Sequence, residues 1–182
     1  MKTIIFDLDG TLYDYHAESF LKSKIYIFVK NKVSSLLVQK KLAKDAEAAN
    51  TLLRELFAEY GEELSIAFEK KFGIPRDEFF KYCWNIDAAK FIEKDDSIQD
   101  TLKKCRQKYS MILLSDAPAI WVNRVLAHLN ITSIFDVVKT GDSDIRKSFK
   151  YALKALLEVR GLKGIDCVIV GDEYLTDIEP AK

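Results

Sequence analysis

The sequence predicts an α/β fold in which a parallel sheet is interrupted, after its first strand, by a helical insertion. Short apolar runs of strand length stand near the N-terminus and again in the second half of the chain. Helical patterns separate the later runs, and strands that alternate with helices favour right-handed crossovers and a parallel sheet. Between the first run and the others the pattern is helical throughout, which indicates a second domain inserted into the first.

The core elements follow from the apolar pattern. Strands are predicted at residues 4–6, 111–114, 135–138 and 167–170. Because most of these runs are continuously apolar rather than alternating, we expect a sheet that is covered on both faces. The covering helices are predicted where apolar side chains recur at helical spacing, around residues 98–105, 122–129 and 149–157.

The insertion carries two helical patterns of its own. Apolar residues recur at spacings of three, four and seven from Leu42 to Tyr60, which predicts one long amphipathic helix. A shorter pattern from Phe20 to Val29 predicts a helix before it. The sequence therefore predicts a core domain of residues 1–14 and 93–182 and a helical domain of residues 15–92.

Composition limits the partners of the chain. Of its 182 residues, 48% are hydrophobic, and 28 Lys and Arg balance 28 Asp and Glu, so the formal net charge is zero. This balance argues against a protein that binds nucleic-acid polymers. The three cysteines are far apart in sequence, which favours a reducing compartment, and no apolar run approaches the ~18 residues of a membrane span. We expect a cytoplasmic monomer or homodimer with no membrane partner.

Three predicted strands end in a polar side chain. Asp7 follows the first strand, Ser115 follows the strand at 111–114, and Gly171-Asp172 follows the last strand. In an open parallel sheet, ligands bind beyond the carboxyl ends of the strands. We therefore expect these side chains to meet at one edge of the sheet.

These residue types suit phosphoryl transfer. A carboxylate such as Asp7 can attack phosphorus and form an aspartyl-phosphate, which divides a difficult hydrolysis into two easier steps. Mg²⁺ would reduce the repulsion between the two anions, and Asp7 and Asp172 can supply the oxygen ligands that it prefers. Asp9 faces the same side as Asp7 in an extended segment and can exchange a proton with the leaving oxygen. Gly10 permits a tight bend, and Ser115 can donate a hydrogen bond to the phosphoryl group.

These motifs resemble the haloacid dehalogenase superfamily of phosphohydrolases. Its first motif, D-x-D-G-T, is matched from Asp7 to Thr11, and its second, an apolar strand ending in Ser or Thr, is matched up to Ser115. Its fourth motif, G-D-x(4)-D, is matched by Gly171-Asp172 and Asp177. The resemblance spans nearly the whole chain and implies a Rossmann-like parallel sheet with an inserted α-helical cap of the first class.

Two short stretches resemble one branch of the superfamily. Residues 10–13 and 59–61 look like the pyrimidine 5′-nucleotidase branch of the superfamily.

The family normally adds a helix and a short strand after its fourth motif, whereas this sequence stops at Pro180-Ala181-Lys182. Either the sequence is incomplete or the edge strand is absent. In the second case, the strand at 167–170 is expected to be uncovered and prone to pair with another chain.

Residues and resemblance together give a full set of site residues. The predicted catalytic residues are Asp7, Asp9 and Lys147; the phosphate-binding residues are Ser115, Gly10, Thr11 and Asp116; and the Mg²⁺ ligands are Asp7, Asp9, Asp172 and Asp177. A lysine should stabilise the phosphoryl charge, and Lys147 is chosen because it stands at the start of the helix at 149–157. In the family's third motif, a spacer separates the lysine from the helix that follows it. Counting back from the helix at 149–157 places the usual lysine position on Ser143, whereas counting forward from Phe135 places it on Lys147. Lys139 is the alternative choice for this lysine.

The predicted activity is Mg²⁺-dependent hydrolysis of a small phosphorylated metabolite, such as a nucleotide, phosphoglycolate or a sugar phosphate. A phosphomutase of the same build would keep Asp9 but return the phosphoryl group to its substrate. A dehalogenase needs the nucleophile without a protonating acid two residues later, so Asp9 argues against that activity. A non-enzymatic phosphoacceptor of the receiver type gathers similar groups but lacks a helical insertion, and its phosphorylated Asp is not on the first strand.

Overall fold

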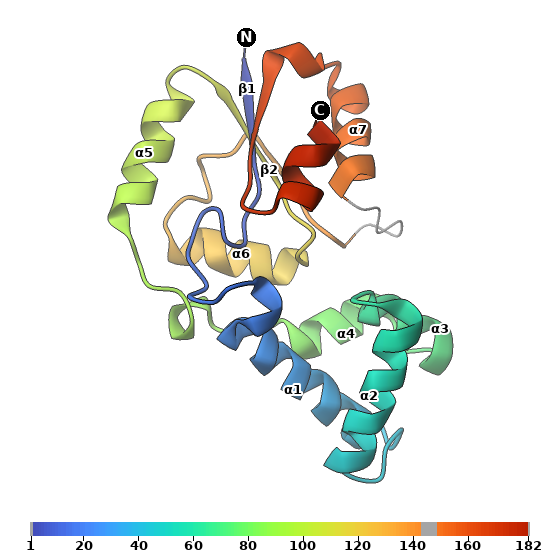
Figure 1. Ribbon diagram of the computed structural model, residues 1–182. Coiled ribbons are helices and arrows are strands. Elements are labelled where there is room, and N and C mark those ends of the chain that lie inside the picture. Colours follow the sequence, from blue (N-terminus) through green and yellow to red (C-terminus); the bar gives the residue numbers. More distant parts are fainter. Residues whose placement is uncertain (1, 143–148, 182) are drawn as a thin grey trace. The chain divides into compact units, whose positions relative to one another are not determined.

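The computed structural model describes residues 2–142 and 149–181. Contacts within the chain divide it into two compact units. One unit contains residues 1–16 and 87–182, and the other contains residues 17–86. The first unit holds the sheet, and the second is built from helices (Figure 1). That the helical unit serves as a cap over a substrate stays a prediction.

The sheet is parallel, as the sequence predicts. Within the described residues it has four strands in the order β3-β2-β1-β4. The strands are β1 (Thr3–Phe6), β2 (Ser110–Leu114), β3 (Val137–Lys139) and β4 (Cys167–Val170). In register, Phe6 stands opposite both Leu113 and Val170, so the three strands β1, β2 and β4 end nearly level. Their polar successors consequently emerge at the same edge.

Helices pack on the sheet from both sides. They are α5 (Asp96–Arg106), α6 (Ala119–His128) and α7 (Phe149–Arg160), and Figure 1 shows α5 and α7 on opposite sides of the strands. Leu153 and Leu156 of α7 join a buried cluster with Ile5, Ile112 and Leu114. This burial of aliphatic side chains is the main stabilising contribution that the core can make.

The expectation that both faces are covered is wrong for β4. Val168 is 55% exposed and Val170 is 39% exposed, whereas Ile169 packs against the α7 cluster. The reason is position, because β4 lies at the edge of the sheet with β1 as its neighbour, and α7 packs on one face of it. A continuous apolar run therefore did not require burial on both sides.

The helical unit contains four α-helices among its described residues. They are α1 (Lys24–Gln39), α2 (Ala46–Tyr60), α3 (Leu64–Phe72) and α4 (Arg76–Cys83). The predicted start of the long helix at Leu42 is wrong, because the Asp45 side chain accepts a hydrogen bond from the Ala48 amide and begins the helix there. In the same way, the Ser23 hydroxyl accepts from the Tyr26 amide and begins α1 after the predicted start at Phe20.

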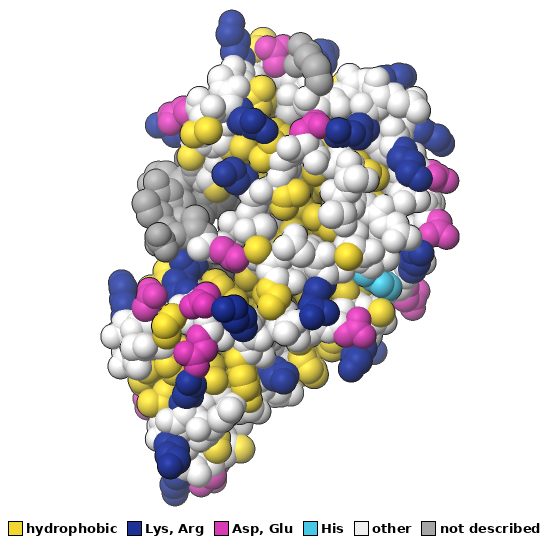
Figure 2. Space-filling view, turned by 180° about the vertical axis from the view of Figure 1, so that it is seen from behind, with side chains coloured by type: hydrophobic (Ala, Val, Ile, Leu, Met, Phe, Trp, Pro, Cys, Tyr) yellow, Lys and Arg dark blue, Asp and Glu magenta, His cyan; other side chains and the backbone are white. Residues whose placement is uncertain are grey.

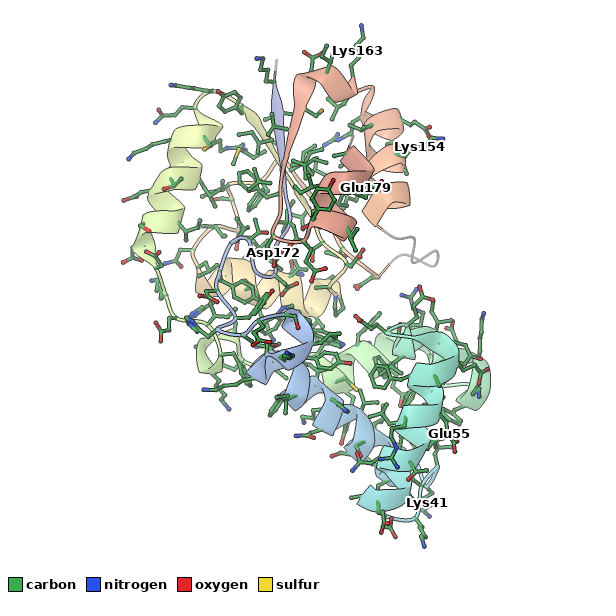
Figure 3. The ribbon with its side chains drawn as sticks, in the orientation of Figure 1. Lys41, Glu55, Lys154, Lys163, Asp172 and Glu179 are labelled. Atoms are coloured by element: carbon green, nitrogen blue, oxygen red, sulfur yellow. The ribbon has the colours of Figure 1, made fainter. Side chains whose placement is uncertain are left out.

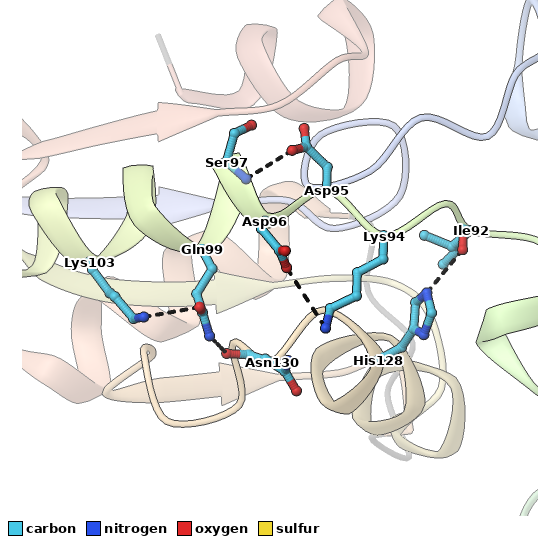
Figure 4. A network of polar contacts seen from close by, with 9 residues as sticks. All are labelled: Ile92, Lys94, Asp95, Asp96, Ser97, Gln99, Lys103, His128 and Asn130. Carbon is cyan, nitrogen blue, oxygen red and sulfur yellow. Dashed lines mark hydrogen bonds and ion pairs between the residues drawn. The ribbon is translucent and has the colours of Figure 1, made fainter.

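A polar network joins the beginning of α5 to the end of α6 (Figure 4). The His128 ring nitrogen Nε2 lies 2.9 Å from the Ile92 carbonyl oxygen, and the Gln99 amide donates to the Asn130 carbonyl at 2.6 Å. Asp95 caps α5 by accepting from the Ser97 amide. These bonds give His128 a structural role within the sheet-bearing unit.

On the face that Figure 2 shows, Lys and Arg side chains are interspersed with Asp and Glu side chains. Apolar side chains appear between them. None of the helices described in residues 2–142 and 149–181 is long and apolar enough to cross a membrane.

Candidate active site

Three carboxylates meet at the carboxyl edge of the sheet. Asp7 follows β1, Asp172 follows β4, and Asp177 lies in the short helix after β4. One oxygen from each lies within 4.8 Å of the others. Asp172 is exposed and sits at the end of β4 in Figure 3, whereas Asp177 is only 4% exposed. The group thus combines two more enclosed acids with one that is open to solvent.

The spacing and chemistry of this group fit a hard divalent cation. Two oxygens bound to one Mg²⁺ at about 2.1 Å lie about 3 to 4 Å apart. The 4.8 Å limit on the three carboxylates is close to that span, so small side-chain rotations would bring them onto one ion. Asp9 is not part of the group, and its predicted role as a fourth ligand stays a prediction.

The electrostatics of the site favour the binding of a cation. Burial, followed by repulsion from Asp9, raises the pKa of Asp7 from 3.8 to about 8, and Asp177 and Asp172 add to the rise. The backbone N–H of Leu8 opposes this shift by hydrogen bonding to the carboxylate. A bound cation would supply the opposite charge and favour the ionised, nucleophilic form of Asp7.

Two glycines let the acids approach the backbone. A Cβ added at Gly171 would lie 2.3 Å from Asp177 Oδ2, and one added at Gly10 would lie 2.2 Å from Asp172 Oδ2. Gly10 also has a φ of +86°, in the left-handed region that favours glycine. Asp177 Oδ2 accepts from the Glu173 amide at 3.0 Å, which fixes that carboxylate against the chain.

Substitution of Gly10 by Ala is expected to disturb the acid group as well as the backbone. Gly73 is a matched control, because its φ of +64° and ψ of +20° place it in the left-handed region and an added Cβ there meets nothing within 4 Å. Both variants should lose about 1 to 2 kcal/mol through left-handed strain. Gly10→Ala alone should also reduce the rise in melting temperature on adding Mg²⁺, because its Cβ displaces Asp172. Equal Mg²⁺ responses in thermal unfolding would contradict this expectation.

Two hydrogen bonds, one to the backbone of β3 and one within the loop after β2, hold Ser115 in place. It is 3% exposed, its amide donates to the Lys139 carbonyl at 3.0 Å, and its Oγ accepts from the Ala117 amide at 3.1 Å. Because Oγ acts as an acceptor in that bond, the hydroxyl proton stays available for donation to a phosphoryl oxygen. This arrangement is compatible with the phosphate contact that the sequence predicts for Ser115.

The loops after β2 and β3 are packed tightly together. The Gly141 amide donates to the Ala117 carbonyl, and a Cβ added at Gly141 would lie 1.9 Å from the Asp116 carbonyl oxygen. Asp142 Oδ1 accepts from the Ala119 amide at 2.9 Å, at the N-terminus of α6. The side chain of Asp116 is exposed, and its predicted phosphate contact stays a prediction.

Two aromatic side chains hold the carboxyl group of Asp9. Its Oδ1 accepts hydrogen bonds from the Tyr13 hydroxyl and from the Trp121 indole N–H. Burial raises the pKa of Asp9, and these two hydrogen bonds oppose the rise. Tyr13 and Trp121 were not predicted as site residues. Trp121 lies in a helical pattern, where an aromatic residue indicates core packing, and Tyr13 lies in the loop after the first motif, whose path the sequence does not specify.

Other neighbours of the acids come from the loop after β1. The Thr11 hydroxyl donates to Asp7 Oδ2 over 3.4 Å, a long hydrogen bond. The Tyr15 hydroxyl donates to Asp172 Oδ2 at 3.0 Å. Thr11 is therefore placed beside Asp7, and its predicted phosphate contact stays a prediction. No sequence motif pointed to Tyr15.

The charge-stabilising lysine is the one predicted component that the structure does not place. Lys147 and the alternative position Ser143 lie outside the described residues. Lys139 ends β3 with an exposed side chain. In Figure 3, Lys163 lies at the opposite end of the unit from Asp172, and the exposed Lys154 stands on α7.

A cavity of about 480 Å³ lies beside the loop after β1. It shares Gly10 and Thr11 with the acid site, but neither Asp7 nor Asp172 lines it. Its other walls come from the loop itself, the start of α5 and Leu129 at the end of α6. The cavity is large enough for a small metabolite, but it does not expose the proposed nucleophile.

Known proteins resemble this chain over its whole length. A family model for haloacid dehalogenase-like hydrolases matches residues 1–182. Human N-acylneuraminate-9-phosphatase is 24% identical over an alignment of 197 residues, and the alignment covers 98% of this chain and 77% of that protein. A haloacid dehalogenase phosphatase from Thermococcus onnurineus matches with a TM-score of 0.65 at 20% identity, covering 100% of this chain and 81% of its own. A protein assigned as a β-phosphoglucomutase, from Thermotoga maritima, matches with a TM-score of 0.56 at 18% identity, and the match covers 100% of this chain and 80% of that protein. At such identities the two structures establish the fold alone.

Proposed function

The chain belongs to the haloacid dehalogenase-like hydrolase family, and on this premise we propose that it is a Mg²⁺-dependent phosphomonoester hydrolase acting through Asp7. The observation that carries the proposal is the group formed by Asp7, Asp172 and Asp177 at the carboxyl edge of the sheet. It supports both parts of the chemistry, because one carboxylate can attack phosphorus while the group holds a cation. The relationship to a curated phosphatase supports the choice of a phosphate ester as substrate.

The first half of the reaction would form an aspartyl-phosphate. Asp7 attacks phosphorus as the bond to the leaving oxygen breaks, and Asp9 gives its proton to that oxygen. Bound Mg²⁺ would neutralise charge on the phosphoryl group and on the acids. The Ser115 hydroxyl donates a hydrogen bond to a phosphoryl oxygen and orients it.

The second half would release inorganic phosphate. Asp9, now ionised, takes a proton from a water molecule as the water oxygen attacks phosphorus. The bond between phosphorus and Asp7 breaks, and the carboxylate is restored. Because Asp9 lies two residues from Asp7, one acid can serve both proton transfers without a change in the backbone.

The substrate we propose is a phosphomonoester of a small metabolite. A sugar-acid phosphate is included because the human relative is an N-acylneuraminate-9-phosphatase. Nucleoside monophosphates, phosphoglycolate and sugar phosphates are the candidates that the sequence predicts. The site itself recognises the phosphate ester, which these compounds share.

A phosphate-release screen tests the proposal. The protein is incubated with this panel and with p-nitrophenyl phosphate, with Mg²⁺ or with EDTA. We expect release from at least one ester with Mg²⁺ and loss of release with EDTA. Folded protein that binds Mg²⁺ but hydrolyses none of the esters would overturn the proposal. Conversion between glucose phosphate isomers without phosphate release would instead identify a phosphomutase.

The raised pKa of Asp7 predicts a pH-dependent response to the metal. Because the folded pKa is about 8 and the ordinary value is 3.8, the folded state holds a proton that the unfolded state releases between these values. Metal-free protein should therefore lose stability as the pH rises from about 4 to about 8. Mg²⁺ competes with this proton, so its stabilisation should grow over the same range. Thermal unfolding at several pH values, with and without Mg²⁺, measures the effect, and Asp7→Asn should flatten it.

A further inference from the structure

Two side chains from different parts of the chain converge on one oxygen of Asp9. The Tyr13 hydroxyl comes from the loop after β1, and the Trp121 indole comes from α6. The indole Nε1 lies 2.9 Å from Asp9 Oδ1, and Trp121 is fully buried. Since an indole N–H can only donate, its bond requires an acceptor at this place.

The second oxygen of Asp9 is left open. In the part of the chain that the structure describes, Oδ1 accepts both bonds and Oδ2 accepts none. Two donors on one oxygen fix the side-chain torsions of a carboxyl group, so the direction of its other oxygen is fixed as well. Tyr13 is 8% exposed, so both donors stand on well-packed side chains.

We propose that Tyr13 and Trp121 are positioning residues that hold Asp9 by Oδ1 and aim Oδ2 at the leaving oxygen of the substrate. This inference rests on the proposed function, in which Asp9 transfers the proton. Neither aromatic side chain needs to touch the substrate. Their effect is to keep the proton donor within hydrogen-bond reach of the oxygen that departs.

A positioning role of Tyr13 and Trp121 affects two classes of phosphate ester differently, whereas a role in packing alone does not. When the bond between phosphorus and an alkyl oxygen breaks, that oxygen must receive a proton from Asp9, because an alkoxide is a poor leaving group. A p-nitrophenolate leaves as an anion and needs no proton. Misplacement of Asp9 should therefore slow the hydrolysis of alkyl phosphates more than that of p-nitrophenyl phosphate.

The test measures kcat and KM for both ester classes in wild type, Tyr13→Phe and Trp121→Phe. For the alkyl ester we expect kcat to fall about 10- to 100-fold with little change in KM, a part of the 10²- to 10⁴-fold that such proton transfer contributes. For p-nitrophenyl phosphate, kcat should fall less than about threefold. Tyr13→Phe removes a single oxygen atom, so it keeps the test decisive even if Trp121→Phe fails to fold.

Two control variants separate positioning from stability. Tyr109→Phe removes a hydroxyl just before β2, at the end of that strand away from Asp7. Leu102→Ala removes buried packing on α5, another element, without removing a donor. Tyr109→Phe should leave both rates unchanged, and Leu102→Ala should lower the melting temperature without changing the ratio of the two rates.

The outcomes distinguish this inference from the proposed function. An equal loss on both esters, or no loss on either, in Tyr13→Phe would overturn the positioning role while leaving the phosphatase proposal intact. Absence of hydrolysis of every ester by the wild type would overturn both. A selective loss on the alkyl ester, reproduced in both variants and in neither control, would support the inference.

Discussion

Replacement of Asp7 by Asn is expected to abolish phosphate release and, at the same time, to raise the melting temperature of the metal-free protein. An amide cannot form the acyl-phosphate, so kcat should fall by on the order of 10⁴-fold or more, as when the nucleophile of other covalent enzymes is removed. The substitution also removes a carboxyl group whose charge is opposed by burial and by Asp9, Asp177 and Asp172. The gain in stability should be largest near pH 8 and above, where the wild-type carboxyl is ionised.

The direction of the change in melting temperature shows why activity is lost in Asp7→Asn. Loss of activity with a lower melting temperature would indicate simple damage to the fold. Loss of activity with a higher melting temperature indicates a residue kept for chemistry at a cost in stability. The amide of residue 7 would still donate to the Val170 carbonyl, so the strand pairing is not expected to change.

Asp100→Asn is a suitable control for this experiment. It makes the same chemical change at an exposed position of α5. Both its rate and its melting temperature should stay close to those of the wild type. Wild-type rates in Asp7→Asn would contradict the mechanism, because they would exclude Asp7 as the nucleophile. An unchanged melting temperature in metal-free Asp7→Asn would contradict the electrostatic account of the site.

The meeting of the acids could be predicted from sequence because it depends on strand ends. Parallel strands of similar length end at one edge, and the register of Phe6 with Leu113 and Val170 makes that edge level. The positions of Asp7 and Asp172 then follow from the chain itself. In contrast, the apolar pattern does not specify the short helix at residues 174–178 that brings Asp177 to the group, and Asp177 was predicted only from the family's fourth motif.

The surroundings of Asp9 could not be predicted, because they depend on the path of a distant helix. Trp121 is 112 residues away in sequence, and its apolar neighbours on α6 make it look like an ordinary core residue. Tyr13 reaches Asp9 because Gly10 turns the chain with a positive φ. The sequence showed that Gly10 allows a bend, but not which side chain the bend would bring to Asp9.

Replacement of Asp172 by Asn is expected to weaken Mg²⁺ binding with little loss of stability. Asp172 is exposed, and the Tyr15 hydroxyl that donates to its Oδ2 would find an acceptor oxygen in Asn as well. The dissociation constant of Mg²⁺ should rise by at least about 100-fold, because loss of an outer-sphere partner alone costs about 10- to 100-fold. Calorimetric titration with Mg²⁺ measures this directly, without reference to activity.

Asp177→Asn should behave differently, although the two acids belong to one group. Asp177 is 4% exposed, and its Oδ2 accepts from the Glu173 amide, so an Asn side chain that keeps its oxygen there turns its own buried NH₂ group to the place of the other carboxylate oxygen. We expect weaker Mg²⁺ binding together with a lower melting temperature, because a buried donor would be left unsatisfied. Glu179 is exposed and is labelled in Figure 3, and Glu179→Gln removes one charge nearby and should change neither property. Equal Mg²⁺ affinities in all three variants would show that the carboxylates do not hold the metal.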